Sequence, residues 1–255
     1  MIIAMDIGNT NIKIGVFKGE ELFKSWRVAT DPMKTSDELG MVILDLLQNE
    51  KVDLNKISSI IVSSVAPSMN YTIEHMCNYY FHKKPIMVST NINLGIEIGY
   101  KNPKELGADR ISTAVAAYYI YGGPVIIIDF GSATTFGVVD KEGKFIGGAI
   151  APCIKTSAES LVNATAKLPR IELNRPDNII GKGTVENMQS GIIYGFRGLV
   201  EYMINGIKAE MNLEDIKIVG TGGLGELVNF EDSPVKIIDR ALSLKGLRII
   251  ESLNR

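Results

Sequence analysis

The chain has 255 residues, of which 45% are hydrophobic and 22% are charged, and its formal net charge is −2. This composition is typical of a soluble globular protein. No Lys/Arg block suggests a nucleic-acid surface, and no apolar run approaches the roughly 20 residues that span a bilayer. The start MIIAMDIGNT has no basic leader, so we expect a cytoplasmic protein without nucleic-acid or membrane partners.

The first half of the chain contains several β-rich segments and an amphipathic helical pattern that follows Thr35. The helix start is indicated by Thr35-Ser36-Asp37-Glu38, which carries the N-cap signal of a capping box. Periodicity predicts strands at 2–6, 12–17 and 21–29, a helix after Thr35, a strand at 57–63, a helix at 70–81, a strand at 85–88 and an apolar helix at 110–121.

The second half repeats this order. The pattern predicts strands at 124–130, 135–140 and 144–150, a mainly helical region at 153–211, a strand at 216–219 and a final helix after Ala241. Three meandering strands followed by helices and strands, found twice, indicate a mixed α/β protein with a central sheet in each half. We therefore expect two similar domains, residues 1–121 and 122–255.

A short sequence motif occurs in both halves, at the end of an apolar strand. The first copy is Asp6-Ile-Gly8-Asn9-Thr10 and the second is Asp129-Phe-Gly-Ser132-Ala-Thr-Thr. Glycine lets backbone N–H groups approach an anion, whereas the carboxylate needs a cation that travels with the phosphate. Two such hairpins predict a nucleoside triphosphate and its metal ion in a cleft between the domains.

Lys13 strengthens the phosphate hypothesis for the first hairpin. Asn9 and Thr10 can donate hydrogen bonds to phosphate oxygens, and Lys13 supplies a point charge for the β or γ phosphate. The alternative is an ordinary Asn-Thr turn with a solvated lysine, which would need neither the aspartate nor a second copy.

Gly107-Ala108-Asp109-Arg110 precedes the apolar helix that ends at Tyr121. The carboxylate of Asp109 could accept a proton from a substrate hydroxyl while the guanidinium binds a substrate carboxylate. The helix dipole is expected to favour the ionised form of Asp109. The alternative is that Asp109 is a helix N-cap beside a surface arginine.

Three weaker signals remain. Gly220-Thr-Gly222-Gly-Leu-Gly225 matches a dinucleotide fingerprint, but too few residues follow it, so we expect a strand-to-helix turn that contacts adenine or ribose. His75, Cys77 and His82 do not have the spacing of a common zinc site. Cys77 and Cys153 fall in different halves and are expected to be free thiols.

Taken together, four motifs in this order resemble type III pantothenate kinase across essentially the whole chain: residues 6–13, 107–110, 129–134 and Gly147-Gly-Ala-Ile-Ala-Pro152. That family belongs to the superfamily of acetate and sugar kinases, heat-shock chaperones and actin. The resemblance implies a duplicated actin-like, ribonuclease H-like α/β fold. It also implies ATP-dependent phosphorylation of pantothenate, the first step of coenzyme A synthesis.

The resemblance assigns roles to single residues. Asp6, Gly8, Asn9, Thr10, Lys13 and Ser132 would bind ATP, with Mg²⁺ at Asp6, and Asp109 would be the general base. Tyr100, Gly107, Ala108, Asp109 and Arg110 would hold pantothenate, and Thr184 would reach it from the partner subunit of a homodimer. Asp129 would hold a monovalent cation, K⁺ or NH₄⁺.

The chain departs from the family pattern at two positions. Ser132 stands where the family usually has threonine, which keeps the hydroxyl, and Cys153 stands where it usually has glycine.

Two other functions remain open. One is a kinase of another small hydroxy acid on the same scaffold, and the other is a non-catalytic nucleotide-binding regulator, which would not require Asp6, Asp109 and Asp129 together.

Overall fold

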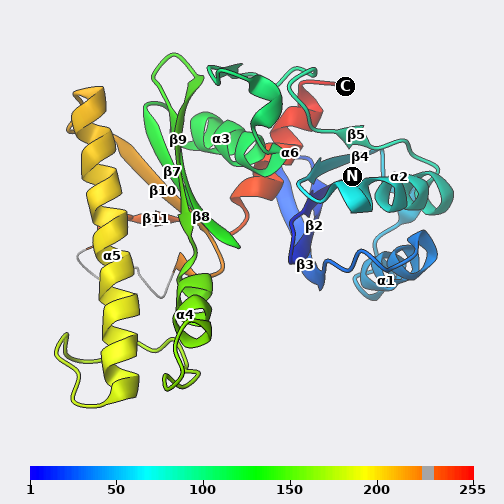
Figure 1. Ribbon diagram of the computed structural model, residues 1–255. Coiled ribbons are helices and arrows are strands. Elements are labelled where there is room, and N and C mark those ends of the chain that lie inside the picture. Colours follow the sequence, from blue (N-terminus) through cyan, green and yellow to red (C-terminus); the bar gives the residue numbers. More distant parts are fainter. Residues whose placement is uncertain (226–232) are drawn as a thin grey trace. The chain divides into compact units, whose positions relative to one another are not determined.

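The computed structural model describes residues 1–225 and 233–255 of the chain (Figure 1). Two compact units are present. The first comprises Met1–Ile120, Gly143–Phe145 and Ala241–Arg255, and the second comprises Tyr121–Glu142 and Ile146–Arg240. The expected division at residue 121 did not include the return of the last helix to the first unit.

The first sheet has five strands in the order β3-β2-β1-β4-β5. Its strands β1 and β2, and β2 and β3, are antiparallel, whereas β4 is parallel to β1 and β5 is parallel to β4. The bounds are β1 Ile2–Ile7, β2 Asn11–Lys18, β3 Glu21–Ala29, β4 Ser59–Ser64 and β5 Ile86–Met87. The associated helices are α1 Ser36–Asn49, α2 Pro67–Phe81, α3 Ala108–Tyr121 and α6 Leu242–Ser252, with 3-10 turns η1 Leu54–Lys56 and η2 Pro103–Glu105.

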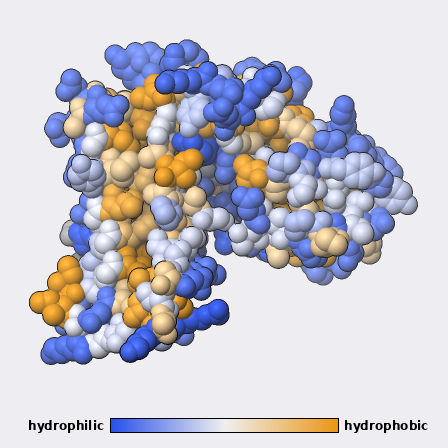
Figure 2. All heavy atoms as spheres, viewed as in Figure 1, coloured by the Kyte–Doolittle hydropathy of each residue, from blue (hydrophilic) through white to orange (hydrophobic). Residues whose placement is uncertain are grey.

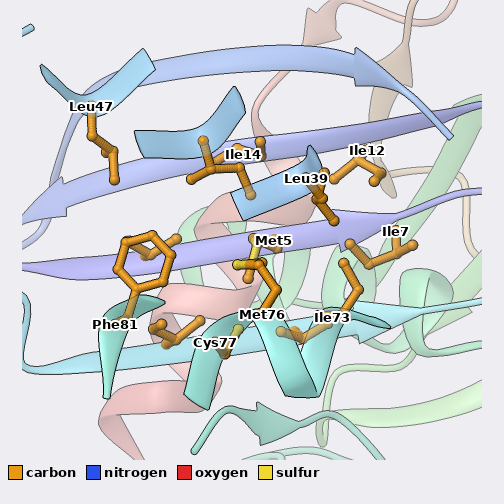
Figure 3. Packing of buried hydrophobic residues seen from close by; sticks show 14 of the residues in the cluster. Met5, Ile7, Ile12, Ile14, Leu39, Leu47, Ile73, Met76, Cys77 and Phe81 are labelled. Carbon is orange, nitrogen blue, oxygen red and sulfur yellow. The ribbon is translucent and has the colours of Figure 1, made fainter. Parts of the chain in front are cut away.

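One face of this sheet forms the core of the first unit. Alternate residues of β1 and β2, such as Met5 and Ile14, pack against α1 and α2 (Figure 3). The alternation follows from the two-residue period of a strand, so Asp6 and Lys13 lie on the opposite face. Helix α1 begins as predicted, because the Thr35 side chain accepts a hydrogen bond from Glu38 N and Glu38 completes the capping box.

The second sheet has six strands in the order β11-β10-β7-β8-β9-β6. Strands β7 and β8 are antiparallel, and β10 is parallel to both β7 and β11. The bounds are β6 Glu97–Ile98, β7 Val125–Phe130, β8 Ala133–Val139, β9 Lys144–Pro152, β10 Lys217–Gly222 and β11 Ile237–Ile238. Helices α4 Ile154–Asn163 and α5 Thr184–Met211 accompany it, and α5 covers a core that includes Ile128, Phe136, Ile193 and Phe196.

The two sheets share one design. The order β3-β2-β1-β4-β5 of the first recurs as β9-β8-β7-β10-β11 in the second, with β6 added at one edge. In both, the aspartate-bearing strand lies between an antiparallel and a parallel neighbour. This repetition confirms the expected duplicated α/β fold.

Several element boundaries differ from those predicted, and three of the differences concern helices. The region 153–211 is mainly helical, as predicted, but it is divided. Helix α4 ends at Asn163 and α5 begins at Thr184, and Pro169 and Pro176 between them disfavour a continuous helix. Helix α2 begins at Pro67, a position that suits proline because the first helical N–H needs no partner within the helix. Helix α3 begins at Ala108, two residues earlier than expected.

Candidate active site

The first hairpin places Asp6 and Lys13 side by side. They are register partners on β1 and β2, and Lys13 Nζ lies 3.5 Å from Asp6 Oδ2. The turn is closed by a 3.0 Å hydrogen bond from Gly8 N to Asn11 O, and the Thr30 hydroxyl donates to Gly8 O at 2.7 Å. Asn9 and Thr10 are exposed at the tip. The hairpin thus presents polar groups outward above an ion pair of a buried aspartate and a half-buried lysine.

Asp6 is compatible with a bound cation. Its side chain is buried, and Oδ1 has no hydrogen-bond partner among the residues that the structure describes. A buried carboxylate oxygen without a partner is unfavourable, so a ligand that supplied a cation or a donor would relieve that cost. Mg²⁺ is commonly held by one or two carboxylates together with substrate phosphates. Asp6 therefore fits Mg²⁺ that arrives with a nucleotide.

The second hairpin places Asp129 between two hydroxyl residues. Asp129 on β7 is the register partner of Thr135 on β8 and of Thr221 on β10, and Ser132 is exposed at the turn. Gly222 has a φ of +95°, and a Cβ there would lie 2.7 Å from Asp129 Oδ1. Glycine at this position therefore leaves room beside the carboxylate.

The glycine-rich segment after residue 219 was predicted to be a strand-to-helix turn. That prediction is wrong for Gly220 and Gly222, which belong to strand β10. Gly220 accepts a hydrogen bond from Asp239 N at 2.8 Å. The part of the predicted turn that would follow Gly225, residues 226–232, lies outside the described residues.

Asp109 is in the first turn of α3 and is not its N-cap. Gly107 O accepts the hydrogen bond from Ile111 N at 3.1 Å, so Gly107 caps the helix and Asp109 is its second residue. The Oδ1 atom of Asp109 accepts a 2.7 Å hydrogen bond from Arg110 N. The alternative role of Asp109 as a helix N-cap is therefore wrong.

The surroundings of Asp109 shift its pKa upward. Burial raises the pKa of Asp109 above its ordinary value, and the nearby charge of Asp6 raises it further. The hydrogen bond from Arg110 N and the positive charge of Arg110 act in the opposite direction. The sequence-based expectation considered only the helix dipole, which favours the ionised form. Loss of solvent has the larger effect, so the net shift of the Asp109 pKa is upward.

Arg110 is held by two aromatic rings. Its Nη1 donates a 2.9 Å hydrogen bond to Tyr100 Oη, and its Cζ lies 5.7 Å from the Tyr100 ring centroid and 5.4 Å from that of Phe145. These contacts fix a planar guanidinium, the geometry suited to a carboxylate ligand. Sequence analysis missed Phe145, since an aromatic residue in a predicted strand normally signals only core packing.

Each unit brings together part of the predicted set. In the first, Asp6, Lys13, Asp109, Arg110 and Tyr100 interact through the pairs described above. Ala108 is buried in the first turn of α3. In the second, Asp129 and Ser132 share one hairpin, and Thr184 is exposed as the first residue of α5.

The hinted His/Cys metal cluster is not formed. His75 stacks between the rings of Tyr71 and Tyr79, Cys77 is buried in the core, and His82 ends α2 in a left-handed conformation. Within residues 1–225 and 233–255, no three His, Cys, Asp or Glu side chains gather as a metal site. In the same ranges, no helix combines the length and apolar character needed to cross a membrane.

Cys153 takes over a structural role at the position where glycine was expected. It has an extended backbone, with φ −77° and ψ 160°, and its Sγ accepts a 3.3 Å hydrogen bond from Thr156 N as the N-cap of α4. This backbone conformation is open to any residue. The substitution therefore does not distort the start of α4, and both Cys77 and Cys153 are free thiols.

Solved structures with a similar fold include several kinases. A Campylobacter jejuni protein described as a Baf family transcriptional activator matches with a TM-score of 0.61 at 20% identity, covering 98% of this chain and 97% of that chain. The ROK hexokinase of Thermus thermophilus matches with a TM-score of 0.55 at 12% identity, covering 98% and 97%. An inorganic polyphosphate/ATP-glucomannokinase from Arthrobacter matches with a TM-score of 0.51 at 15% identity, covering 98% of each chain.

These identities are low, so the likeness establishes the fold alone. The sequence comparison goes further, because the family model described as type III pantothenate kinase matches residues 2–206. That match includes both aspartate hairpins, the Gly107–Arg110 segment and the first residues of α5. This protein belongs to the type III pantothenate kinase family.

Proposed function

We propose that this protein transfers the γ-phosphoryl group of ATP to the primary hydroxyl of pantothenate, giving 4′-phosphopantothenate. Family membership supports the choice of substrate. The observation that carries the chemistry is Asp109, a carboxylate whose pKa is raised by burial beside a guanidinium held by two aromatic rings. A base and an anion-binding group then lie on adjacent residues, as a hydroxy acid substrate requires.

Asp109 is the general base in this proposal. It accepts the proton of the attacking hydroxyl, and a raised pKa makes the carboxylate a stronger base than a solvated aspartate. Arg110 binds the carboxylate of pantothenate, with Tyr100 fixing the guanidinium through the 2.9 Å hydrogen bond. Gly107 and Ala108 complete the substrate-binding segment, which the start of α3 holds in place.

The hairpins bind the nucleotide in this proposal. Gly8, Asn9 and Thr10 donate to phosphate oxygens, Lys13 places its ammonium near the β and γ phosphates, and Ser132 contacts ATP from the second hairpin. Mg²⁺ at Asp6, when bound, neutralises phosphate charge. Asp129 holds the monovalent cation, K⁺ or NH₄⁺. Phosphoryl transfer depends mainly on such positioning and charge compensation, so these residues need supply no covalent step.

We also propose that the protein works as a homodimer, with Thr184 contacting pantothenate bound to the partner subunit. Exposed apolar side chains near the start of α5 support this arrangement. Ile179 and Ile180 precede the helix, Val185 lies in its first turn and Tyr202 lies further along it. Figure 2 shows hydrophobic residues at the surface around this end of α5. Exposed apolar side chains that gather on one part of a surface are typical of protein interfaces.

Mass spectrometry of the reaction products tests the proposed activity. The purified protein is incubated with ATP, Mg²⁺, K⁺ and pantothenate, and we expect a product heavier than pantothenate by one phosphoryl group. Omitting pantothenate is the first control, and the Asp109→Asn protein purified in the same way excludes a contaminating kinase. Phosphorylation of other small hydroxy acids but not pantothenate would replace the substrate, and ATP binding without any product would favour the regulator.

A further inference from the structure

A serine lies beside the aspartate of the first hairpin. Ser63 on β4 is the register partner of Asp6 on β1, and the two strands are parallel. Partnered residues of parallel strands point to the same face of the sheet, with the strands about 4.8 Å apart. Their chain neighbours Val62 and Met5 belong to the hydrophobic core on the other face. Ser63 and Asp6 therefore project together on the face opposite that core.

The Ser63 hydroxyl is buried without a protein partner. The residue is 0% exposed, and within the described residues Oγ accepts or donates no hydrogen bond. The Oδ1 atom of Asp6, its neighbour, is in the same condition. Two adjacent buried polar atoms without partners are unfavourable in isolation, and one shared partner would relieve both.

The second unit repeats this arrangement independently. Thr221 on β10 is the register partner of Asp129 on β7, again in a parallel pair. Thr221 is 1% exposed, and its Oγ1 also has no hydrogen-bond partner in the described part of the chain. A buried hydroxyl thus occurs at the same topological position beside each aspartate. The recurrence ties the hydroxyl to the aspartate rather than to local packing.

We infer that Ser63 and Thr221 are positioning residues that each share a water molecule with the neighbouring aspartate and thereby orient its carboxylate toward a cation. A buried water needs two to four polar partners. A hydroxyl can be one of them, because it can donate one hydrogen bond and accept others. Carboxylates that bind metal ions are commonly oriented by such outer hydrogen bonds. The inference rests on the cation roles proposed above for Asp6 and Asp129.

Thr221 allows the sharper test, because valine has the same shape without the hydroxyl. The thermal midpoint of the protein is measured against K⁺ concentration, with Na⁺ as the control salt, since a ligand that binds the folded state raises the midpoint. We expect Thr221→Val to raise, by about tenfold, the K⁺ concentration that gives half of the full rise in thermal midpoint. Tenfold is the lower end of the loss in metal affinity seen when such outer hydrogen bonds are removed. Thr221→Ser keeps the hydroxyl and should stay within about twofold of the wild type.

Thr134→Val is the matched control. Thr134 is likewise buried with an unpartnered hydroxyl among the described residues, but it pairs with Phe130 and so lies on the core face. Its K⁺ response should equal that of the wild type. An unchanged response in Thr221→Val, or equal shifts in Thr221→Val and Thr134→Val, would overturn the inference for Thr221. A wild type that does not respond to K⁺ would instead overturn the proposed cation role of Asp129 and the inference built on it.

For Ser63 the same measurement is made with Mg²⁺ and ATP. In Ser63→Ala, the Mg²⁺ concentration that gives half of the rise in thermal midpoint should be about tenfold higher than in the wild type. The response to ATP alone should change little. Ser243→Ala is the matched control, because Ser243 is a buried serine of α6 whose hydroxyl also lacks a partner within the described residues. Equal Mg²⁺ responses in Ser63→Ala and the wild type would overturn the role of Ser63.

Discussion

A Cβ atom at Gly107 would overlap the Oδ1 atom of Asp109. The same oxygen accepts the 2.7 Å hydrogen bond from Arg110 N, which holds the carboxylate against the first turn of α3. The glycine therefore has two roles: it caps the helix through its carbonyl, and it leaves the space that the carboxylate occupies. Its importance lies in that space, because its φ does not require glycine.

Gly107→Ala should accordingly impair catalysis more than stability. The added methyl group must displace the Asp109 carboxylate, and misplacing a reacting group by about 1 Å can lower the rate on the order of 100-fold. We expect kcat to fall by about 10- to 100-fold, with ATP affinity unchanged. Gly206→Ala is the control, because Gly206 is on α5 and a Cβ there meets no atom. Steady-state kinetics on the two variants decide the point, and equal kcat values would contradict it.

The sequence predicts the hairpins well because strand alternation and the Asp-Gly turns are local signals. Thr35 and Glu38 likewise predict their capping box from four consecutive residues. The start of α3 is placed too late because Asp is a favoured N-cap residue, whereas the structure uses the carbonyl of Gly107 as the cap. The residue type that local preference favours as the N-cap, Asp109, is therefore not the residue that caps the helix, Gly107.

Other parts of the site depend on contacts between segments that are distant in sequence. Phe145 reaches Arg110 across 35 residues, and Ser63 lies beside Asp6 only through the register of two parallel strands. Neither position carries a motif, since an aromatic or a serine in a strand is ordinary. Likewise, the upward shift of the Asp109 pKa depends on burial and on the charge of Asp6, and the position of Asp109 in the helix does not reveal either of them.

Arg110→Lys should weaken substrate binding more than turnover. A lysine keeps the charge but loses the planar group that Tyr100 and Phe145 hold, so it cannot make a paired contact with a carboxylate. We expect KM for pantothenate to rise about tenfold, which corresponds to about 1.4 kcal/mol, with KM for ATP unchanged. Tyr100→Phe removes only the hydroxyl and should give a smaller increase. Equal KM values for Arg110→Lys and the wild type would exclude carboxylate binding by this group.

Activity should depend on a monovalent cation if Asp129 has its proposed role. Replacing K⁺ by Na⁺ should slow the wild type strongly, because the two ions differ in size and hydration while the anionic hairpin stays the same. Asp129→Ala should have low activity that no longer differs between the two salts. The measurement is kcat at equal ionic strength in K⁺ and Na⁺, and equal wild-type rates would rule out a selective cation site.

A homodimer should be visible by sedimentation at assay concentration. If Thr184 contacts pantothenate on the partner subunit, Thr184→Ala should raise KM for pantothenate without changing the sedimentation coefficient. Tyr202→Glu adds a charge at an exposed aromatic residue of α5 and should favour the monomer if that helix forms the interface. A wild-type protein that is fully active as a monomer would require another role for Thr184.

Asp109→Asn separates catalysis from stability. It removes the proposed base while keeping the shape and an oxygen that can accept from Arg110 N, so kcat should fall by roughly 10²- to 10⁴-fold with ATP affinity retained. The raised pKa gives a second expectation. A carboxyl whose folded-state pKa is raised adds stability below its unfolded pKa, and this stability is lost as the pH rises through the folded-state pKa.

The ionised Asp109 therefore destabilises the folded protein near neutral pH, and asparagine removes that cost. We expect the thermal midpoint of Asp109→Asn to exceed that of the wild type at pH 7. The difference should shrink as the pH falls through the raised pKa of Asp109 and should be absent below the ordinary aspartate pKa of about 3.9. Asp45→Asn is the control, because Asp45 is an exposed residue of α1, and it should leave kcat and the midpoint nearly unchanged. An Asp109→Asn protein with near-normal kcat would refute the base assignment, whereas low kcat with a lowered midpoint at pH 7 would refute only the unfavourable burial of its charge.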